Sequence, residues 1–206
     1  QTARTLIETT AMRFTDVAFA AGFSSLRQFN DTIREVFDAT PTELRAKRNL
    51  APSDPGSLSI RLPFRAPLAG DYFLAWADKR TVAGVANVEA GRLSTALRLE
   101  NGNGIAVLEI AEQWVQCNLE LDDVADLAGA VAQCRRMLDL DADPTHIDAA
   151  LVAVKSLAGY IGALPGLRSP GSSDGFATLV FAVLGQQRSV AAARTLASRI
   201  VKRASE

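Results

Sequence analysis

The stretch from Thr15 to Arg45 constrains the fold most, because it predicts two short helices joined by a tight glycine turn. Gly22 can adopt the positive φ that ends a helix and turns the chain sharply. Ser24 or Ser25 can then accept the free N–H groups at the start of the second helix. Apolar side chains recur in that helix at near-helical spacing, so one of its sides must be buried. These apolar residues are Leu26, Phe29, Ile33 and Phe37. The pattern predicts a helix-turn-helix.

The opposite side of the second helix carries polar side chains that can reach base edges or phosphates from the major groove of DNA. These side chains belong to Arg27, Gln28, Asn30, Asp31 and Arg34. Two helices joined by a glycine turn are also a common packing unit with no DNA contact. On the pattern alone, both interpretations remain open.

A family resemblance favours DNA contact. Gly22-Phe23, the later Phe29, Ile33 and Phe37, and then Thr40-Pro41 and Leu44-Arg45 together resemble the second helix-turn-helix of an AraC-type regulator. The resemblance implies that the N-terminal half of the second helix reads bases, which assigns this role to Ser25, Arg27, Gln28, Asn30 and Asp31. Asp31 departs from the expected chemistry, because a carboxylate repels phosphate and accepts only from the N4 amino group of cytosine.

The segments that flank this motif also predict helices. Residues 1–10 place Ala3, Leu6 and Ile7 on one side, and in AraC-type proteins such a helix follows a first helix-turn-helix subdomain, which this chain would lack. Thr40 followed by Glu43 predicts a capping box that begins a third short helix.

Composition places the chain among ordinary globular proteins. It has 206 residues, is 48% hydrophobic and 22% charged, and carries a net charge of −1. No apolar run reaches the length of a membrane span and no signal peptide is recognisable, so we expect a cytoplasmic protein without a membrane partner. Cys117 and Cys134 are expected to be reduced core thiols, and the single histidine, His146, to be exposed at a helix start. No cofactor or metal site is expected.

The charges are unevenly distributed along the chain. Acidic residues dominate from Glu120 to Asp143, whereas the end of the chain is basic. The basic residues there are Arg188, Arg194, Arg199, Lys202 and Arg203. This pattern predicts that the end attracts phosphate and the middle avoids it. A solvated helix face is the alternative explanation of the basic run.

Residues 49–57 are rich in proline, glycine and serine, which is typical of a linker. We therefore expect a helix-turn-helix unit at 1–49, a linker at 50–57 and an α+β domain at 58–143. Alternating apolar residues predict strands at 58–64, 81–88, 92–99, 105–111 and 115–121, and the Asn101–Gly104 segment predicts a hairpin between the third and fourth strands. Helices at 68–77 and 122–138 would cover the antiparallel sheet on one face. Nothing in 58–143 predicts catalysis, and Trp76 and Trp114 are expected to be core or interface anchors.

The third region, 144–206, is expected to be all-α. One helix would run through Ile147, Leu151, Val154 and Leu157, and a second would open at Ser173 or Asp174 and bear Phe176, Leu179 and Val183. A polar turn at 185–189 would then lead into a last helix capped by Ser189. The interior of that last helix is predicted to hold Val190, Ala193, Leu196, Ala197 and Ile200.

The sequence PGLRSPGSSDGFATLVFAVLGQQRSVAAARTLASRIV resembles the opening of the helix-hairpin-helix domain of AlkA-type DNA-3-methyladenine glycosylases, and the resemblance extends back to about residue 58. It implies an N-terminal sheet domain followed by the start of an all-α domain. It also implies that the turn approaches DNA and that Gln187 inserts into the base stack where the damaged base has been extruded. The DNA contacts that follow are Gln186, Gln187, Arg188, Ser189 and Arg194.

An AraC-type reader joined to an AlkA-type glycosylase resembles the bacterial Ada-AlkA fusions of the alkylation response. The resemblance implies double-stranded DNA as partner, both promoter and alkylated, and hydrolysis of the N-glycosidic bond of an alkylated purine, with an aspartate stabilising the positive sugar. That aspartate and its hairpin do not occur before Glu206, so we expect a piece of a longer protein that binds DNA without cleaving it. The alternative is an AraC-type transcription factor whose C-terminal domain is a non-catalytic ligand or partner module.

Overall fold

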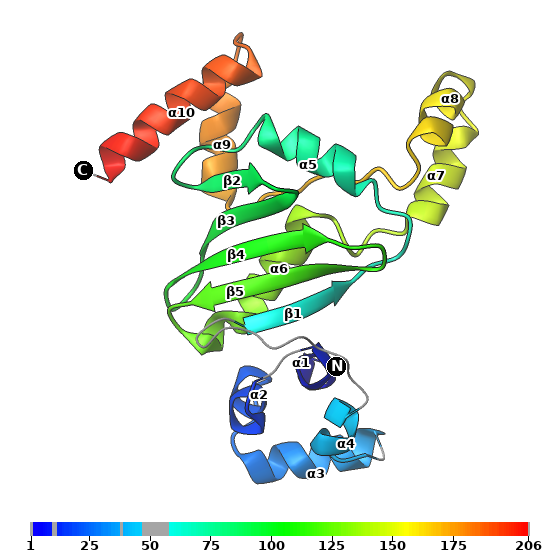
Figure 1. Ribbon diagram of the computed structural model, residues 1–206, viewed down its shortest axis with the longest axis vertical. Helices are drawn as coiled ribbons and strands as arrows, with labels where there is room; N and C mark the ends of the chain where they lie inside the picture. The colour runs from blue at the N-terminus through cyan, green and yellow to red at the C-terminus, as the bar shows by residue number, and fades with distance from the viewer. Residues whose placement is uncertain (1, 10–11, 38, 47–57, 206) are drawn as a thin grey trace.

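The structure is a computed structural model that describes residues 2–9, 12–37, 39–46 and 58–205 (Figure 1). The predicted linker at 50–57 lies outside the described residues. The chain is α+β, as predicted: a helical bundle comes first, an antiparallel sheet with its helices follows, and two pairs of helices complete it. Within the described residues, no helix is both long and apolar enough to span a membrane.

Four helices form the N-terminal bundle, and each begins and ends close to its predicted place. They are α1 (Thr2–Thr9), α2 (Phe14–Ala20), α3 (Leu26–Phe37) and α4 (Pro41–Ala46). Gly22 takes a φ of 84°, which lets α2 end and the chain turn into α3. Phe23 in this turn packs edge-on against the buried Phe29, with ring centroids 5.5 Å apart. The core therefore holds α3 at a set angle to α2.

The predicted capping box at α4 is confirmed. The backbone N–H of Thr40 donates to Oε2 of Glu43 over 2.7 Å, and the N–H of Glu43 donates back to Oγ1 of Thr40 over 3.2 Å. Two N–H groups that would otherwise lack partners are thereby satisfied, and α4 begins where the sequence predicts.

The sheet has five antiparallel strands in the order β1-β5-β4-β3-β2. Their bounds are β1 (Leu58–Pro63), β2 (Ala86–Glu89), β3 (Arg92–Arg98), β4 (Asn103–Ile110) and β5 (Trp114–Leu121). The predicted hairpin joins β3 to β4, with Arg98 opposite Asn103. The predicted strand at 81–88 is wrong in its first half, because Val82 accepts from the N–H groups of both Val85 and Ala86 and the chain turns there instead.

One face of the sheet is buried and the other is polar. The buried face is built from alternate residues, such as Ile60 on β1, Leu108 on β4 and Leu119 on β5. Helix α6 (Leu127–Met137) packs against β4 and β5, and helix α5 (Gly70–Asp78) packs against β2 and β3 (Figure 1). The opposite face carries cross-strand polar pairs such as Arg92 with Glu109, whose Nε and Oε2 atoms lie 3.0 Å apart. This division between the faces sets the strand register.

The two cysteines are free core thiols, as predicted, but the structure places them next to each other. Cys117 lies on β5 and Cys134 on α6, both are buried, and their Sγ atoms are 3.9 Å apart. The hydrogen bond to Cys134, together with burial, raises the pKa of the Cys117 thiol well above its ordinary value. Both thiols are buried between β5 and α6, so this pair contributes to packing.

Two predicted helices are interrupted. The helix expected at 122–138 starts as a 3-10 turn, η1 (Val124–Asp126), capped by the Asp123 carboxylate, and only then becomes α6. The helix expected through Ile147 and Leu157 is divided into α7 (Pro144–Val152) and α8 (Lys155–Ala163), because Val154 between them takes an extended backbone conformation. The apolar residues keep helical spacing across the break at Val154, so the sequence pattern does not show that the helix ends there.

The last two helices are α9 (Gly175–Leu184) and α10 (Val190–Ala204). Ala193 and Ala197 of α10 are buried as predicted, but Val190 and Ile200 are exposed, so the predicted interior of α10 is partly wrong. Phe176 on α9 is 71% exposed. The apolar faces of these helices are therefore only partly covered by the residues that the structure describes.

The helix-turn-helix bundle and the α9–α10 pair lie at opposite ends of the molecule (Figure 1). The bundle meets the sheet through α1, which contacts β1, and through α2, which contacts η1. At the other end, Val201 of α10 lies against Gly84, in the turn before β2. Both surfaces that the sequence assigns to DNA are thus anchored on one central sheet.

A buried arginine joins three segments that are distant in the sequence. The guanidinium of Arg168 donates to the carbonyl oxygens of Asp139 and Ala142, over 3.2 and 2.7 Å, and to those of Arg65 and Pro67, over 2.6 and 3.4 Å. Burial lowers the pKa of Arg168, and the carboxylates of Asp139, Asp148 and Asp143 oppose that shift. Arg168 thereby ties the chain before α5, the α6–α7 connection and the loop before α9 together.

Replacing Arg168 by methionine is expected to lower the free energy of unfolding by about 2 to 4 kcal/mol, because buried carbonyl groups are left without their donor. The same substitution at the exposed Arg136 is the control and should change it by less than about 0.5 kcal/mol. Urea denaturation measures both variants. Equal stability of the two would contradict a structural role for Arg168.

Candidate nucleic-acid interface

The start of α3 is organised by two serines. The N–H of Gln28 donates to Oγ of Ser25 over 3.2 Å, so Ser25 caps the helix as predicted. Oε1 of Gln28 accepts from the Oγ of Ser24 over 2.9 Å and from its backbone N–H over 3.3 Å. The side chains of Ser24, Ser25 and Gln28 are therefore held in place by the hydrogen bonds of the cap.

Beyond the cap, α3 presents one charged stripe. Arg27 and Asp31 lie one turn apart, their side chains are 93% and 68% exposed, and the Nε and Oδ2 atoms are 3.9 Å apart. Arg34 is exposed and follows at the spacing that keeps it on the same stripe. Phe29 and Ile33 are buried on the other side. The structure thus brings Arg27, Asp31 and Arg34 together.

The remaining candidate residues of α3 border this stripe. Asn30 is half-buried and lies to one side of it, and Gln28 is exposed and lies to the other. Figure 1 shows α3 on the side of the bundle that faces away from the sheet. The high exposure of Arg27 and Asp31 shows that their side chains are open to solvent. A duplex can approach α3 without displacing any part of the described chain.

The second candidate surface is the turn between α9 and α10. Gln187 takes a φ of 55°, which is uncommon for a residue with a side chain, and is exposed. The side-chain amide of Gln186 donates to the carbonyl oxygen of Ala182 over 3.2 Å, so it is folded back on α9. Gln187 is therefore the glutamine of this turn whose side chain is not held against α9 by a hydrogen bond among the described residues.

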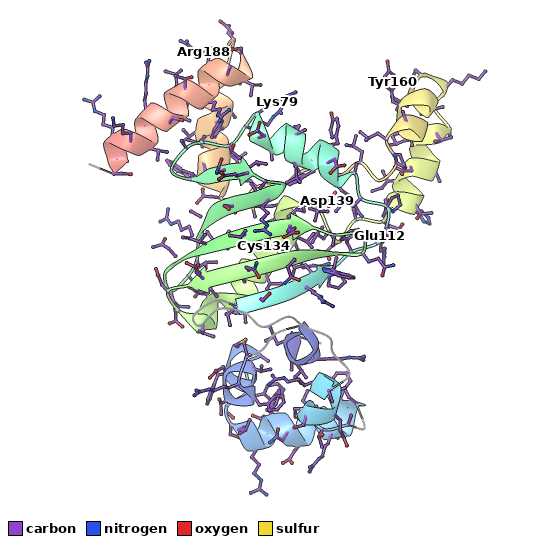
Figure 2. The ribbon with its side chains drawn as sticks, in the orientation of Figure 1. Lys79, Glu112, Cys134, Asp139, Tyr160 and Arg188 are labelled. Atoms are coloured by element: carbon purple, nitrogen blue, oxygen red, sulfur yellow. The ribbon has the colours of Figure 1, made fainter. Side chains whose placement is uncertain are left out.

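The start of α10 is suited to an anion. Oγ of Ser189 accepts from the N–H of Ala192 over 3.2 Å and caps the helix as predicted. Arg188 and Arg194 are exposed beside it, and Figure 2 shows Arg188 at the end of the molecule remote from the bundle. Within the described chain, no carboxylate lies within ion-pair distance of the basic residues from 188 to 203. Their charge is therefore not neutralised inside the described part of the protein.

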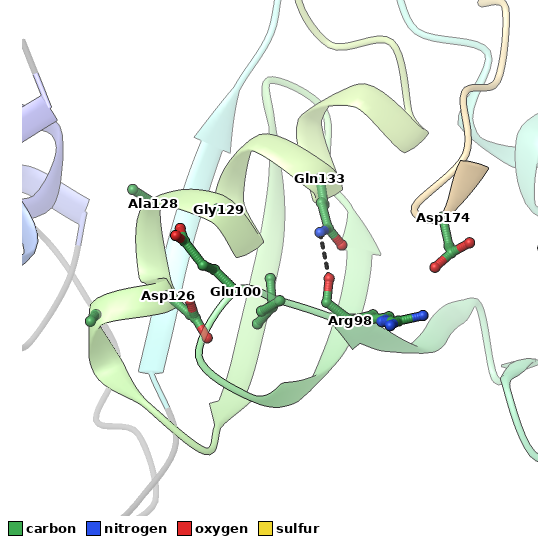
Figure 3. Close-up of a pocket in the computed structure, with 9 residues that line it drawn as sticks. Arg98, Glu100, Asp126, Ala128, Gly129, Gln133 and Asp174 are labelled. Atoms are coloured by element: carbon green, nitrogen blue, oxygen red, sulfur yellow. Dashed lines mark hydrogen bonds between the residues drawn. The ribbon is translucent and has the colours of Figure 1, made fainter. Parts of the chain in front are cut away.

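Two carboxylates line a groove beside the sheet, and each is hydrogen-bonded within the protein. The groove has a volume of about 550 Å³ and lies between the end of β3 and α6, with Asp126 and Asp174 at its two ends (Figure 3). Asp126 accepts from the backbone N–H and the side-chain amide of Asn101, over 3.0 and 2.9 Å, and so holds the β3–β4 hairpin. Asp174 caps α9 by accepting from the N–H of Ala177 over 2.8 Å. Both carboxylates therefore hold local structure.

The two tryptophans also have structural partners. The guanidinium of Arg80 lies 4.5 Å from the ring centre of Trp76, and that of Arg61 lies 4.7 Å from the ring centre of Trp114. Phe73 stacks on Trp76 with ring centroids 6.2 Å apart. Both rings are half-buried against these partners.

Two protein-family models match the chain. The AlkA N-terminal domain matches residues 59–174, and a helix-turn-helix domain matches residues 1–47. The chain is 49% identical over 205 residues to a probable bifunctional transcriptional activator/DNA repair enzyme AlkA of Mycobacterium tuberculosis, and this match covers 98% of this chain and 41% of that protein. It is 32% identical over 146 residues to DNA-3-methyladenine glycosylase 2 of Escherichia coli, covering 68% of this chain and 49% of that protein.

A solved structure shares the fold. It is a 3-methyladenine DNA glycosylase from Archaeoglobus fulgidus, with a TM-score of 0.62 and 17% sequence identity, and the match covers 69% of this chain and 50% of that one. The chain spans less than half the length of the two curated relatives.

Proposed function

The chain belongs to the AlkA N-terminal domain family, and because a helix-turn-helix domain precedes that domain, we propose that it binds DNA in two ways. Through α3 it would recognise a promoter, as a regulator of transcription does. Through the α9–α10 turn it would engage alkylated DNA, as part of a protein that excises alkylated purines in the cytoplasm. The exposed, charged stripe on α3 is the observation that carries this proposal.

We infer a division into functional units from the same arrangement. Residues 1–49 form the promoter-reading unit and 50–57 the linker, while 58–143 form a sheet domain. Residues 144–206 supply the surface for damaged DNA. The 49% identity to a protein described as a bifunctional activator and repair enzyme runs through all of these units and supports one protein with both roles.

At the promoter, α3 would lie in the major groove with its first two turns against the base edges. The guanidinium of Arg27 can donate two hydrogen bonds to O6 and N7 of a guanine. The hydroxyl group of Ser25 can donate a hydrogen bond to a phosphate. Arg34 lies on the same stripe, further along the helix, where a base or a phosphate is within reach. The buried Phe29 and Ile33 hold α3 rigidly while these contacts form.

At damaged DNA, the turn at 185–189 would approach the backbone of the duplex. The capped N-terminus of α10, flanked by Arg188 and Arg194, offers free N–H groups and positive charge to a phosphate. Gln187 would enter the base stack where the damaged base leaves it, because it is exposed at the tip of the turn between the two helices.

The proposed reaction is hydrolysis of the N-glycosidic bond of an alkylated purine, in which an aspartate stabilises the positive charge that develops on the sugar. Asp126, Asp174 and Glu109 each have a partner inside the described chain and are not assigned that role. The described residues would instead bind and distort the DNA.

Replacing Arg27 by alanine is expected to weaken binding to a cognate promoter by about 1 to 3 kcal/mol, because the bidentate hydrogen bonds to guanine can no longer form. Arg136→Ala, which removes the same charge from α6, is the control. Titration of labelled duplexes measures both. An equal weakening on every sequence would assign Arg27 to a phosphate, and unchanged binding would remove it from the interface.

Replacing Arg188 or Arg194 by alanine is expected to flatten the salt dependence of non-specific binding, by about 0.9 in the slope of log K against log salt for each phosphate that the protein no longer neutralises. Affinities for a random duplex at several salt concentrations give the slope. Arg136→Ala again serves as the control. A slope unchanged by both substitutions would show that this end of the chain does not face DNA.

Because α3 and the α9–α10 turn lie at opposite ends of the molecule, a promoter duplex and an alkylated duplex are expected to bind at the same time. Two short duplexes with different fluorophores should therefore form a ternary complex with the protein and show energy transfer only in its presence. Arg27→Ala should weaken binding of the first duplex and Arg188→Ala that of the second. Competition between the two duplexes would contradict the arrangement.

A further inference from the structure

We propose that α3 reads a guanine and a cytosine in neighbouring base pairs, with Arg27 as the donor and Asp31 as the acceptor, and that Gln28 takes part only as a donor. The proposal rests on the proposed promoter-reading role of α3 and specifies which bases that role selects. It follows from which hydrogen-bonding groups of Arg27, Gln28 and Asp31 are already occupied within α3 and which remain free for DNA.

The carbonyl oxygen of the Gln28 side chain is occupied by hydrogen bonds from Ser24, and only its amide N–H groups are free. A glutamine recognises adenine by accepting from N6 through its carbonyl oxygen while its amide N–H donates to N7. In this structure the carbonyl oxygen of Gln28 already accepts from two donors on Ser24. Only the N–H groups of Gln28 remain for DNA, and they suit an acceptor such as a purine N7. The adenine-specific pair is therefore not formed.

Asp31 supplies the acceptor that Gln28 cannot. An ionised carboxylate only accepts, and the major groove offers donors at N4 of cytosine and N6 of adenine. The N6 donor of adenine lies between two acceptors, its own N7 and O4 of the paired thymine, and both repel a carboxylate. The N4 donor of cytosine has an acceptor on one side only, O6 of the paired guanine. The exposed carboxylate of Asp31 therefore favours cytosine.

Arg27 and Asp31 act as a linked pair. The Nε of Arg27 lies 3.9 Å from Oδ2 of Asp31, a long ion pair that leaves the terminal nitrogens of the guanidinium free for guanine and the carboxylate free for cytosine. The four-residue step from Arg27 to Asp31 advances about 6 Å along α3, less than two base-pair steps of about 3.4 Å. The two bases that the pair contacts consequently lie close together in the site.

The negative charge of Asp31 distinguishes this role from that of a solvated surface residue. A carboxylate on a DNA-facing helix weakens attraction to every phosphate and strengthens only the contact with cytosine. Removing it should therefore raise affinity for random DNA and lower discrimination at one position. A residue that merely keeps α3 soluble would show the first effect without the second.

The first experiment selects preferred duplexes from a random library with the wild-type chain and with Asp31→Ala. We expect the wild type to enrich a site with a guanine and a nearby cytosine, and Asp31→Ala to keep the guanine preference but lose the cytosine preference. Glu35→Gln removes one charge from the exposed face of the same helix and is the control. It should raise affinity for random DNA and leave both preferences intact.

The second experiment assigns the contact to one atom. In the selected site, the cytosine is replaced by an analogue that lacks the 4-amino group. This change should weaken wild-type binding by about 5- to 140-fold and should have no further effect on Asp31→Ala. Replacing the guanine by 7-deazaguanine should likewise weaken the wild type and not Arg27→Ala. Independent, additive effects of base and side-chain changes would overturn the assignment.

A third variant tests Gln28. If the wild type enriches an adenine whose preference disappears in Gln28→Ala, the carbonyl oxygen of Gln28 reads a base and the proposal is overturned. The failures are distinguishable: a wild-type chain that enriches no sequence refutes the promoter-reading role itself. A clear site whose base preferences survive Asp31→Ala leaves that role standing and refutes this inference alone.

Discussion

The guanidinium of Arg168 makes the contacts on which the layout of the second half of the chain depends. It donates to four backbone carbonyl groups that belong to two connections distant from it in the sequence. The loop that carries Arg168 leads into α9, so the same hydrogen bonds determine where α9 and α10 leave the sheet domain. Gly166 in that loop packs so closely on Pro67 that a side chain could not be accommodated. The position of the α9–α10 turn is thus a consequence of these contacts.

The two proposed DNA surfaces are built on the same physical principle. In each, a serine caps a helix and a tight turn precedes it, with a positive φ at Gly22 in one case and at Gln187 in the other. The serine satisfies one N–H group of the first turn and leaves others free, and the turn exposes the side chains next to it. Basic residues then surround a rigid helix start. Recognition is separated in this way from the apolar packing that holds each helix.

Local patterns are sufficient to predict much of the fold. The glycine turn, the capping box at Thr40 and the hairpin at 101–104 are all correct, because neighbouring residues decide each of them. The break at Val154 escapes prediction because apolar spacing continues through it. The role of Arg168 also escapes prediction, since its partners are far away in the sequence. For the candidate site, the sequence identifies the residues of α3 but not that Ser24 occupies the carbonyl oxygen of Gln28.

The sequence by itself determined the order of the elements, the buried faces of the strands and of α3, and the types of side chain on the exposed side of α3, because periodicity and turn chemistry are local properties. Only the tertiary structure decided which distant groups meet, such as the thiols of Cys117 and Cys134, and that the two proposed DNA surfaces lie at opposite ends of the sheet domain. These outcomes depend on strand order and on contacts such as those of Arg168. Contacts between segments far apart in the chain leave no periodic mark in it, so no local pattern could reveal them.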